Sequence, residues 1–138
     1  MRTIIAGSRT VIEYEKVCAV IKAANFNITE VVSGCARGVD TLGEQWAAAS
    51  GIPVKRFPAE WNKHGKLAGP VRNQQMADYA DALIAVWDGR SKGTKDMIDR
   101  ASKLNKTVFV RMLGRTEPEP SIFNLDAPPT FYELREEL

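Results

Sequence analysis

The fold of this chain is decided by residues 82–87, which read ALIAVW, and by the turn that follows at residues 88–94, DGRSKGT. An almost uninterrupted apolar run of this length is typical of a strand that is buried on both faces, as in a parallel sheet. The glycines of the turn allow a ligand to approach the backbone closely. We therefore start from this strand and its turn and look for similar pairs along the chain.

Two further turns have the same setting. Residues 33–40 read SGCARGVD and stand between an apolar run at 28–32 and apolar residues at helical spacing over 39–49. The shorter turn Gly7-Ser8-Arg9 follows the apolar run 2–6. Each turn joins a predicted strand to a predicted helix, and the backbone N–H groups at such a junction are suited to hold an anion. The sequence therefore indicates a binder of phosphate-bearing molecules.

The rest of the chain continues the alternation of strands and helices. Apolar positions at helical spacing predict helices over 11–24, over 70–79 and around 97–104, and short apolar runs predict strands at 54–57 and 106–112. Residues 58–69 show no periodicity and are expected to form one long loop. Loops of this length inside a compact domain are usually functional or disordered.

This alternation predicts right-handed β-α-β units and a parallel sheet with helices on both faces. The expected fold is α/β, a single doubly wound Rossmann-like domain with a mainly parallel five-stranded sheet in the order 3-2-1-4-5. Ligands of such sheets bind at the switch point, beyond the carboxyl ends of strands 1 and 4. We assign residues 1–112 to this domain, and residues 113–138 to an extension that packs on the domain or on a partner subunit.

Composition narrows the class of partner. The chain has 19 Lys and Arg against 17 Asp and Glu, a net charge of +2, so it has no broad cationic field for nucleic acid. Its two cysteines fit neither a metal cluster nor a disulfide framework, which favours the cytoplasm. No apolar run reaches the ~20 residues that span a bilayer, so no membrane is expected. Neither the G-x-G-x-x-G nor the Walker A motif occurs, and we expect no metal and no cofactor.

The candidate binding residues come from the three turns, the long loop and the helix that follows this loop. Arginines are expected to neutralise phosphate, because a guanidinium pairs with a phosphate through two parallel hydrogen bonds. Glycines and hydroxyls supply close backbone approach and donors, and a tryptophan from the loop stacks on a base or closes the pocket. The set is Gly7, Ser8, Arg9, Ser33, Gly34, Arg37, Gly38, Asp40, Trp61, Arg72, Asn73, Gly89, Ser91, Gly93 and Thr94.

Several residues have a structural alternative. Asp40 either caps the helix that follows it or accepts a hydrogen bond from a ribose hydroxyl. Arg72 either is solvated on its helix or contacts the ligand. Asp96, within the first turn of its helix, either interacts with the helix dipole and needs no ligand, or faces the pocket as the one well-placed carboxylate near a bound sugar. His64, the sole histidine, is expected on the surface, because no catalytic constellation recruits it.

Taken together, these motifs resemble the YspA-type, YpsA-related branch of the SLOG superfamily over residues 1 to about 111. The resemblance rests on Gly7-Ser8-Arg9, residues 33–40, Glu60-Trp61, Gly65 with residues 68–73, and residues 93–97. It implies a Rossmann-like nucleotide-binding domain. More distant relatives are the LOG phosphoribohydrolases, which cleave the base from nucleoside 5′-monophosphates, and DprA-type proteins, which bind single-stranded DNA.

The resemblance to LOG enzymes implies catalytic candidates. Those enzymes carry a G-G-x-G-T-x-x-E loop that holds phosphate and supplies a catalytic glutamate, together with an arginine from the preceding helix. Arg72 matches that arginine, and Gly93-Thr94 match the loop. Met97 stands in the place of the glutamate, and Asp96 comes one residue early. Asp96, with Arg72, is therefore the candidate for stabilising an oxocarbenium-like sugar or activating water.

Three functions are left open by the sequence. The first is binding of a nucleotide or nucleotide-derived ligand at the carboxyl edge of the sheet, with hydrolysis of its N-glycosidic bond as the enzymatic version. The second is a non-catalytic sensor of such a ligand. The third is DprA-like binding of single-stranded DNA, which the small size and near-neutral charge disfavour. Relatives form dimers, so a homodimer is also open.

Overall fold

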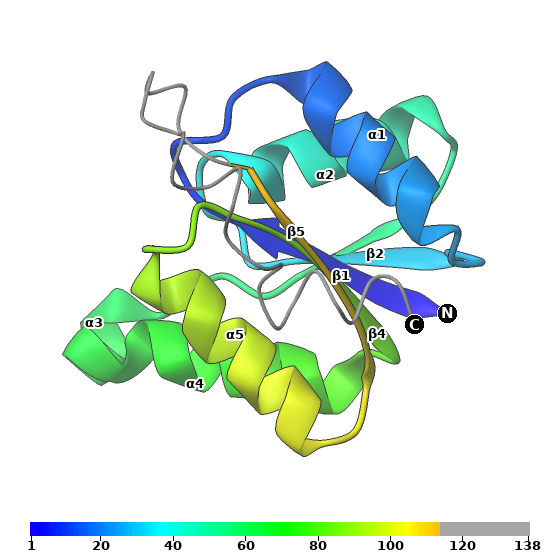
Figure 1. Cartoon of the computed structure of the whole chain (residues 1–138). Helices are drawn as coiled ribbons and strands as arrows, with labels where there is room; N and C mark the ends of the chain where they lie inside the picture. Colours follow the sequence, from blue (N-terminus) through cyan, green and yellow to red (C-terminus); the bar gives the residue numbers. More distant parts are fainter. Residues whose placement is uncertain (114–138) are drawn as a thin grey trace.

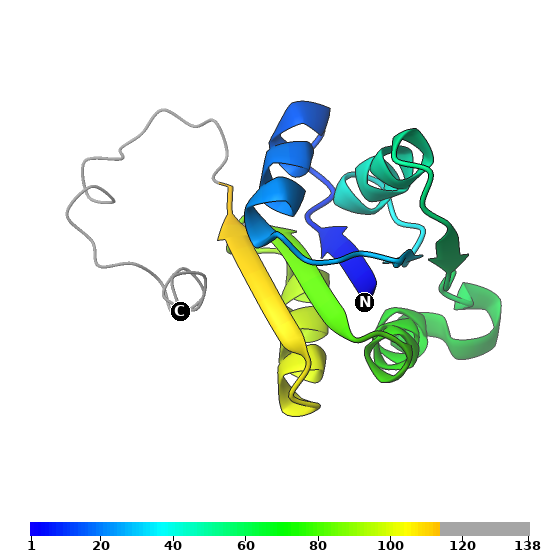
Figure 2. The same ribbon diagram turned by 90° about the vertical axis from the view of Figure 1, so that its right-hand side faces the viewer.

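A five-stranded parallel sheet forms the middle layer of the computed structural model, which describes residues 1–113. The strands are β1 (Arg2–Gly7), β2 (Glu30–Ser33), β3 (Val54–Arg56), β4 (Ala82–Trp87) and β5 (Thr107–Met112). They lie in the order β3-β2-β1-β4-β5, and each neighbouring pair is parallel. Figure 2 shows β5 at one edge of this sheet and β3 at the other. The predicted fold class and strand order are confirmed.

Helices cover both faces of the sheet (Figure 1). One face carries α1 (Tyr14–Ala24) and α2 (Val39–Ala49), and the other carries α4 (Ala68–Tyr79) and α5 (Lys92–Lys103). The short helix α3 (Trp61–His64) leads through the 3₁₀ turn η1 (Gly65–Leu67) into α4. The sheet is therefore enclosed between two helical layers, as doubly wound folds require.

The strand β4 joins the two hydrophobic cores. All six of its residues are buried, and successive side chains of a strand point to opposite faces. Leu83 accordingly belongs to the cluster under α4 and α5, while Ile84 belongs to the cluster under α1 and α2. Full burial of one such side chain contributes about 1.5–3 kcal/mol. The apolar run that decided the fold in the sequence therefore stabilises both layers.

The helix boundaries differ from the sequence expectations at three places. The first helix begins at Tyr14 rather than at residue 11, and α5 already begins at Lys92, so that Gly93 is a helical residue and not part of the turn. The expected loop at 58–69 contains α3 and η1, and α4 begins at Ala68, ahead of Pro70. A proline in the first turn loses no helical hydrogen bond, so it does not mark the exact start.

The C-terminal extension lies outside the described residues except for its first residue. Leu113 donates its backbone N–H to the carbonyl of Trp87 at 3.0 Å and packs against the cluster under α1 and α2. The assignment of residues 114–138 to packing on the domain or on a partner subunit stays a prediction.

Gly43 tests the packing of α2 on β1. A Cβ added at Gly43 would lie 2.7 Å from Cγ2 of Ile5. We expect Gly43→Ala to lower the free energy of unfolding, because overpacking costs about 1–3 kcal/mol and outweighs a helix-propensity gain of at most about 1 kcal/mol. Urea denaturation measures the change.

The control is Gly69→Ala in α4, where the nearest atom to an added Cβ is 3.9 Å away on Trp61. This variant should be as stable as the wild type or slightly more stable. Equal stability of the Gly43 and Gly69 variants would contradict close packing of α2 on β1.

Candidate functional site

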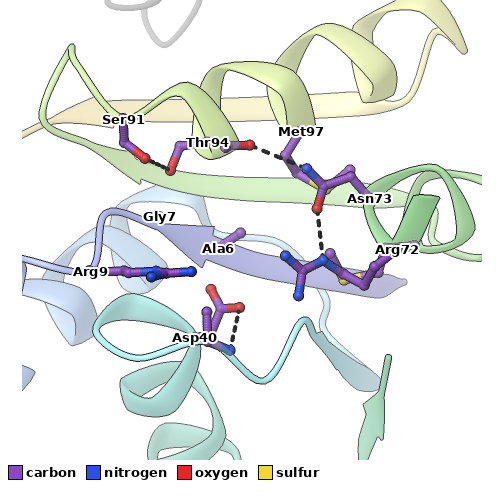
Figure 3. A pocket seen from close by; sticks show the side chains of 12 residues that line it. Ala6, Gly7, Arg9, Asp40, Arg72, Asn73, Ser91, Thr94 and Met97 are labelled. Atoms are coloured by element: carbon purple, nitrogen blue, oxygen red, sulfur yellow. Dashed lines mark hydrogen bonds between the residues drawn. The ribbon is translucent and has the colours of Figure 1, made fainter. Parts of the chain in front are cut away.

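A cavity of about 80 Å³ lies at the carboxyl end of β1, beside β4. We call it the switch-point cavity, because β1 and β4 run side by side there while their connections leave to opposite faces of the sheet. Its walls come from the loop after β1, the start of α2, the middle of α4 and the start of α5 (Figure 3). The lining residues are Ala6, Gly7, Arg9, Ala36, Asp40, Arg72, Asn73, Met76, Ser91, Gly93, Thr94 and Met97.

A second cavity, of about 280 Å³, adjoins the first. We call it the outer cavity. The two share Arg9, Ala36 and Arg72, so the side chains of the two arginines stand at the junction. The remaining lining residues of the outer cavity are Gly34, Cys35, Arg37, Pro58, Ala59 and Trp61. Together the cavities reach the ~300 Å³ at which the volumes of small-molecule sites begin.

Arg72 is fixed by two hydrogen bonds. Its Nε donates to Oδ1 of Asn73 at 3.0 Å, and its Nη1 donates to the carbonyl oxygen of Gly34. A Cβ added at Gly34 would lie 2.9 Å from that Nη1 atom, so a glycine is needed there for the guanidinium to reach the turn. Two of the five N–H donors of the guanidinium are used in this way. Arg72 is therefore a positioned group that lines both cavities, and not a solvated helix residue.

Arg9 lies on the opposite side of the switch-point cavity. Figure 3 shows Arg9 and Arg72 pointing toward one another, with Asp40 between the elements that carry them. Within residues 1–113, the side chain of Arg9 forms no hydrogen bond or ion pair. Its positive charge is thus available to a ligand, and the same holds for Arg37 in the outer cavity.

Asp40 is the carboxylate of the switch-point cavity. It is only 5% exposed, and its Oδ2 accepts a hydrogen bond from the backbone N–H of Ala36 at 3.2 Å. Burial raises the pKa of Asp40 to about 6, against the opposing effect of the Ala36 N–H, the charge of Arg72 and the Gly7 N–H. The carboxylate therefore closes the turn before α2, and its titration lies close to neutral pH.

The start of α5 forms the wall on the β4 side. Oδ1 of Asp88 accepts hydrogen bonds from the N–H groups of Arg90 and Ser91, both at 2.8 Å, which shapes the turn. Ser91 then begins the helix without a side-chain hydrogen bond to its backbone, and its Oγ lies 3.1 Å from Oγ1 of Thr94. The first N–H groups of a helix have no partner within it and carry its positive dipole end. An added Cβ at Gly93 would meet no atom within 4 Å.

Four of the predicted binding residues line neither cavity and instead hold the turns together. Oγ of Ser8 accepts from the N–H of Asp88 at 3.0 Å, and Oγ of Ser33 donates to Glu44 at 2.6 Å. Gly38 has φ +78°, and a Cβ there would lie 2.5 Å from the carbonyl oxygen of Ser8. Gly89, with φ +83°, supplies the left-handed residue of the turn before α5. These four residues therefore stabilise the turns whose other residues line the cavities.

Asp96 also lies outside both cavities. Its Oδ2 accepts from Nδ2 of Asn73 and from Nε of Arg100, both at 2.9 Å. The catalytic role that the sequence resemblance implies for Asp96 stays a prediction.

Sequence reasoning missed four apolar members of the lining of the switch-point cavity. Ala6 lies in β1, and Ala36 lies inside the turn 33–40. Met76 follows Asn73 on α4, and Met97 follows Gly93 on α5. Residues three and four positions apart share a helix face, so the helical spacing from Asn73 and Gly93 was a signal that could have found both methionines.

The remaining features of residues 1–113 that bear on function concern metal ligation, membrane-spanning helices, the cysteines and the histidine. Within residues 1–113 no three His, Cys, Asp or Glu side chains are grouped so as to hold a metal ion. None of the helices there is long and apolar enough to cross a membrane. Cys18 and Cys35 are both free thiols, and His64 lies away from both cavities.

The fold and the position of the cavities define a Rossmann-like domain, and a solved structure shares it. DNA processing protein A (DprA) from Streptococcus pneumoniae superposes with a TM-score of 0.67, over 85% of this chain and 52% of that chain, at 19% sequence identity. At this identity the likeness establishes the fold alone. Residues 1–64 match the model of the YspA, cpYpsA-related SLOG family. The resemblance to this family is therefore confirmed.

Two curated proteins of phage origin are similar in sequence. The chain is 37% identical over 79 residues to the Gene 61 protein of Mycobacterium phage D29. It is 33% identical over 61 residues to the uncharacterized SPbeta prophage-derived protein YoqJ of Bacillus subtilis strain 168. These matches cover 53% and 44% of this chain, and 63% and 32% of the two relatives. The chain thus spans less than two thirds of the length of each.

Asp40 should make stability depend on pH. The folded state raises its pKa from 3.8 to about 6, so folding favours the protonated form. The stabilisation is complete below pH 3.8 and is lost as the pH rises through about 6. Asp40→Asn keeps an acceptor oxygen but does not titrate. Between about pH 4 and pH 7 the wild type should lose about 2–3 kcal/mol of unfolding free energy relative to this variant.

Urea denaturation of both proteins at the two pH values measures the difference. A constant difference in unfolding free energy between wild type and Asp40→Asn would show that the carboxyl titrates at its ordinary pKa.

Proposed function

We propose that this chain binds a nucleotide or nucleotide-derived ligand at the carboxyl edge of its sheet, with a phosphate held between Arg9 and Arg72. The observation that carries the proposal is the convergence of these two arginines on a cavity closed by the first turn of α5. Two guanidinium groups and a helix N-terminus each stabilise an anion, and a low-dielectric wall strengthens all three interactions.

The sizes of the two cavities indicate which part of a nucleotide each of them takes. The switch-point cavity, at about 80 Å³, is far below the ~300 Å³ of a whole small-molecule site, so it takes the phosphate. The outer cavity, at about 280 Å³, takes the sugar and base. Trp61 is 55% exposed there and offers an aromatic face for stacking. The match to the SLOG family is compatible with this assignment.

Hydrolysis of the N-glycosidic bond is the second candidate, and Asp40 is the observation that favours it. A buried carboxyl whose pKa is raised to about 6 is suited to general acid–base work near neutral pH. Asp40 lines the switch-point cavity and accepts from the N–H of Ala36, which lines both cavities, so in this version the sugar lies at the junction of the cavities. Asp96 lines neither cavity. The non-catalytic sensor needs the same binding residues but no proton transfer.

The binding proposal is tested with Arg9→Gln. Isothermal titration with nucleoside 5′-monophosphates should give micromolar affinity for the wild type and an affinity at least about tenfold weaker for the variant, because one charge-assisted hydrogen bond is lost. Arg90→Gln is the matched control, since Arg90 is exposed at the same edge of the sheet and lines neither cavity.

Two outcomes would overturn this proposal. The first is that no nucleotide or nucleotide-derived metabolite gives heat on titration or shifts the melting temperature. This result would show that such molecules are not ligands of the chain. Tight binding of single-stranded oligonucleotides with an affinity that falls steeply as salt rises would indicate the DprA-like alternative, in which several phosphates are neutralised.

Mass spectrometry of each bound nucleotide separates enzyme from sensor. In the hydrolase version the wild type releases free base, and Asp40→Asn stops the release while the nucleotide still binds. Loss of release in Asp96→Asn, with Asp40→Asn active, would instead support the role that the resemblance to LOG enzymes implies for Asp96. If the wild type releases no base at saturating nucleotide, the hydrolase version is wrong and the non-catalytic sensor is the remaining function.

A further inference from the structure

Arg72 stands at one end of a continuous row of side chains. Its Nε donates to Asn73, Asn73 donates to Asp96 at 2.9 Å, and Arg100 donates to the same Asp96 oxygen at 2.9 Å. The row crosses from α5 to α4 and ends, through Nη1 of Arg72, at the carbonyl of Gly34 in the turn after β2. These hydrogen bonds therefore link α5 and α4 to the turn after β2.

Asn73 is the central member of this row. It is buried, and its amide is used on both sides. Oδ1 accepts from Arg72, while Nδ2 donates to Asp96 and, at 3.3 Å, to the carbonyl of Gly93. A reversed amide would direct N–H groups at the Arg72 donor and an oxygen at two acceptors, so only one orientation satisfies every partner. The carboxylate of Asp96 is the charged acceptor that enforces this orientation.

Arg100 holds Asp96 in turn. Besides the ion pair with Asp96, one turn earlier on α5, its Nη1 donates to Oε1 of Gln74 on α4 at 2.9 Å. The Asp96 side chain is thus fixed by one partner on each of the two helices, and it has no lining contact with either cavity. Hydrogen bonds in such a chain polarise and strengthen one another.

We propose that Asp96 is a positioning residue, which acts through Asn73 to aim the guanidinium of Arg72 at the anionic group of the ligand. This inference rests on the proposed function. It differs from the catalytic role because it requires Asp96 as a hydrogen-bond acceptor and not as a titrating group. An asparagine, which keeps an acceptor oxygen, should replace Asp96 in part, whereas an alanine should not.

The experiment compares Asp96→Ala, Asp96→Asn and the matched control Asp99→Ala. Asp99 is also an acid of α5 in an i,i+4 pair, with Lys95 at 2.9 Å, but on an exposed face. Titration with a nucleoside 5′-monophosphate should give an affinity about tenfold weaker for Asp96→Ala, a smaller loss for Asp96→Asn and no change for Asp99→Ala.

A double-mutant cycle shows whether the effect passes through Arg72. In an Arg72→Gln background, Asp96→Ala should cause no further loss of affinity, because the group it positions is gone. A purely structural role would make the two losses of affinity additive. Additive losses, or an Asp96→Ala variant that binds as tightly as the wild type, would overturn the inference.

A ligand-free readout keeps this test separate from that of the proposed function. The Nε–H signal of Arg72 in an NMR spectrum, assigned by its absence in Arg72→Gln, should exchange with water faster in Asp96→Ala than in the wild type or in Asp99→Ala. Unchanged exchange would overturn the positioning role, whether or not nucleotides bind. A wild type with the predicted exchange but no affinity for nucleotides would overturn the proposed function and leave the row intact.

Discussion

The site depends on the absence of a side chain at the end of β1. A Cβ at Gly7 would lie 2.1 Å from the carbonyl oxygen of Val86 in β4 and 2.8 Å from Cγ2 of Val39 at the start of α2. Because these three elements meet at van der Waals distance, the loop after β1 is drawn against the turn before α2. Ser8 ties the same loop to the turn after β4. The glycine at position 7 therefore sets how closely β1, β4 and the start of α2 meet beside the switch-point cavity.

Electrostatics then distinguishes the two sides of the cavity. Arg72 is anchored by hydrogen bonds to Asn73 and Gly34, while Arg9 is exposed and has no partner within residues 1–113. One positive group is thus preorganised and the other is free to adapt, an arrangement that would reduce the ordering cost of binding the proposed phosphate. Asp40 beside them lowers the net positive charge by an amount that depends on pH, because burial places its pKa at about 6.

The fold could be predicted because its signals are local and strong. The alternation of apolar runs with helical spacing predicted the strand order. The turn after the first strand pointed to Arg9, and the helix after the long loop pointed to Arg72, and both residues line the cavity. The surroundings of Asp96 could not be predicted, because they depend on the rotation of α5. With the helix starting at Lys92, residues 93, 94 and 97 line the cavity, and Asp96 contacts α4. Helical phase is fixed by tertiary packing, which the sequence pattern alone does not determine.

Gly93 has a consequence for how this protein can change. It lies inside a helix and has no positive φ, and an added Cβ would meet no atom within 4 Å, so the fold accepts alanine there. Glycine in a helix is less favourable than alanine by up to about 1 kcal/mol. The position also lines the switch-point cavity. A side chain at position 93 would therefore favour the helix but reduce the space of the cavity, so stability and the proposed binding would place opposite demands on this position.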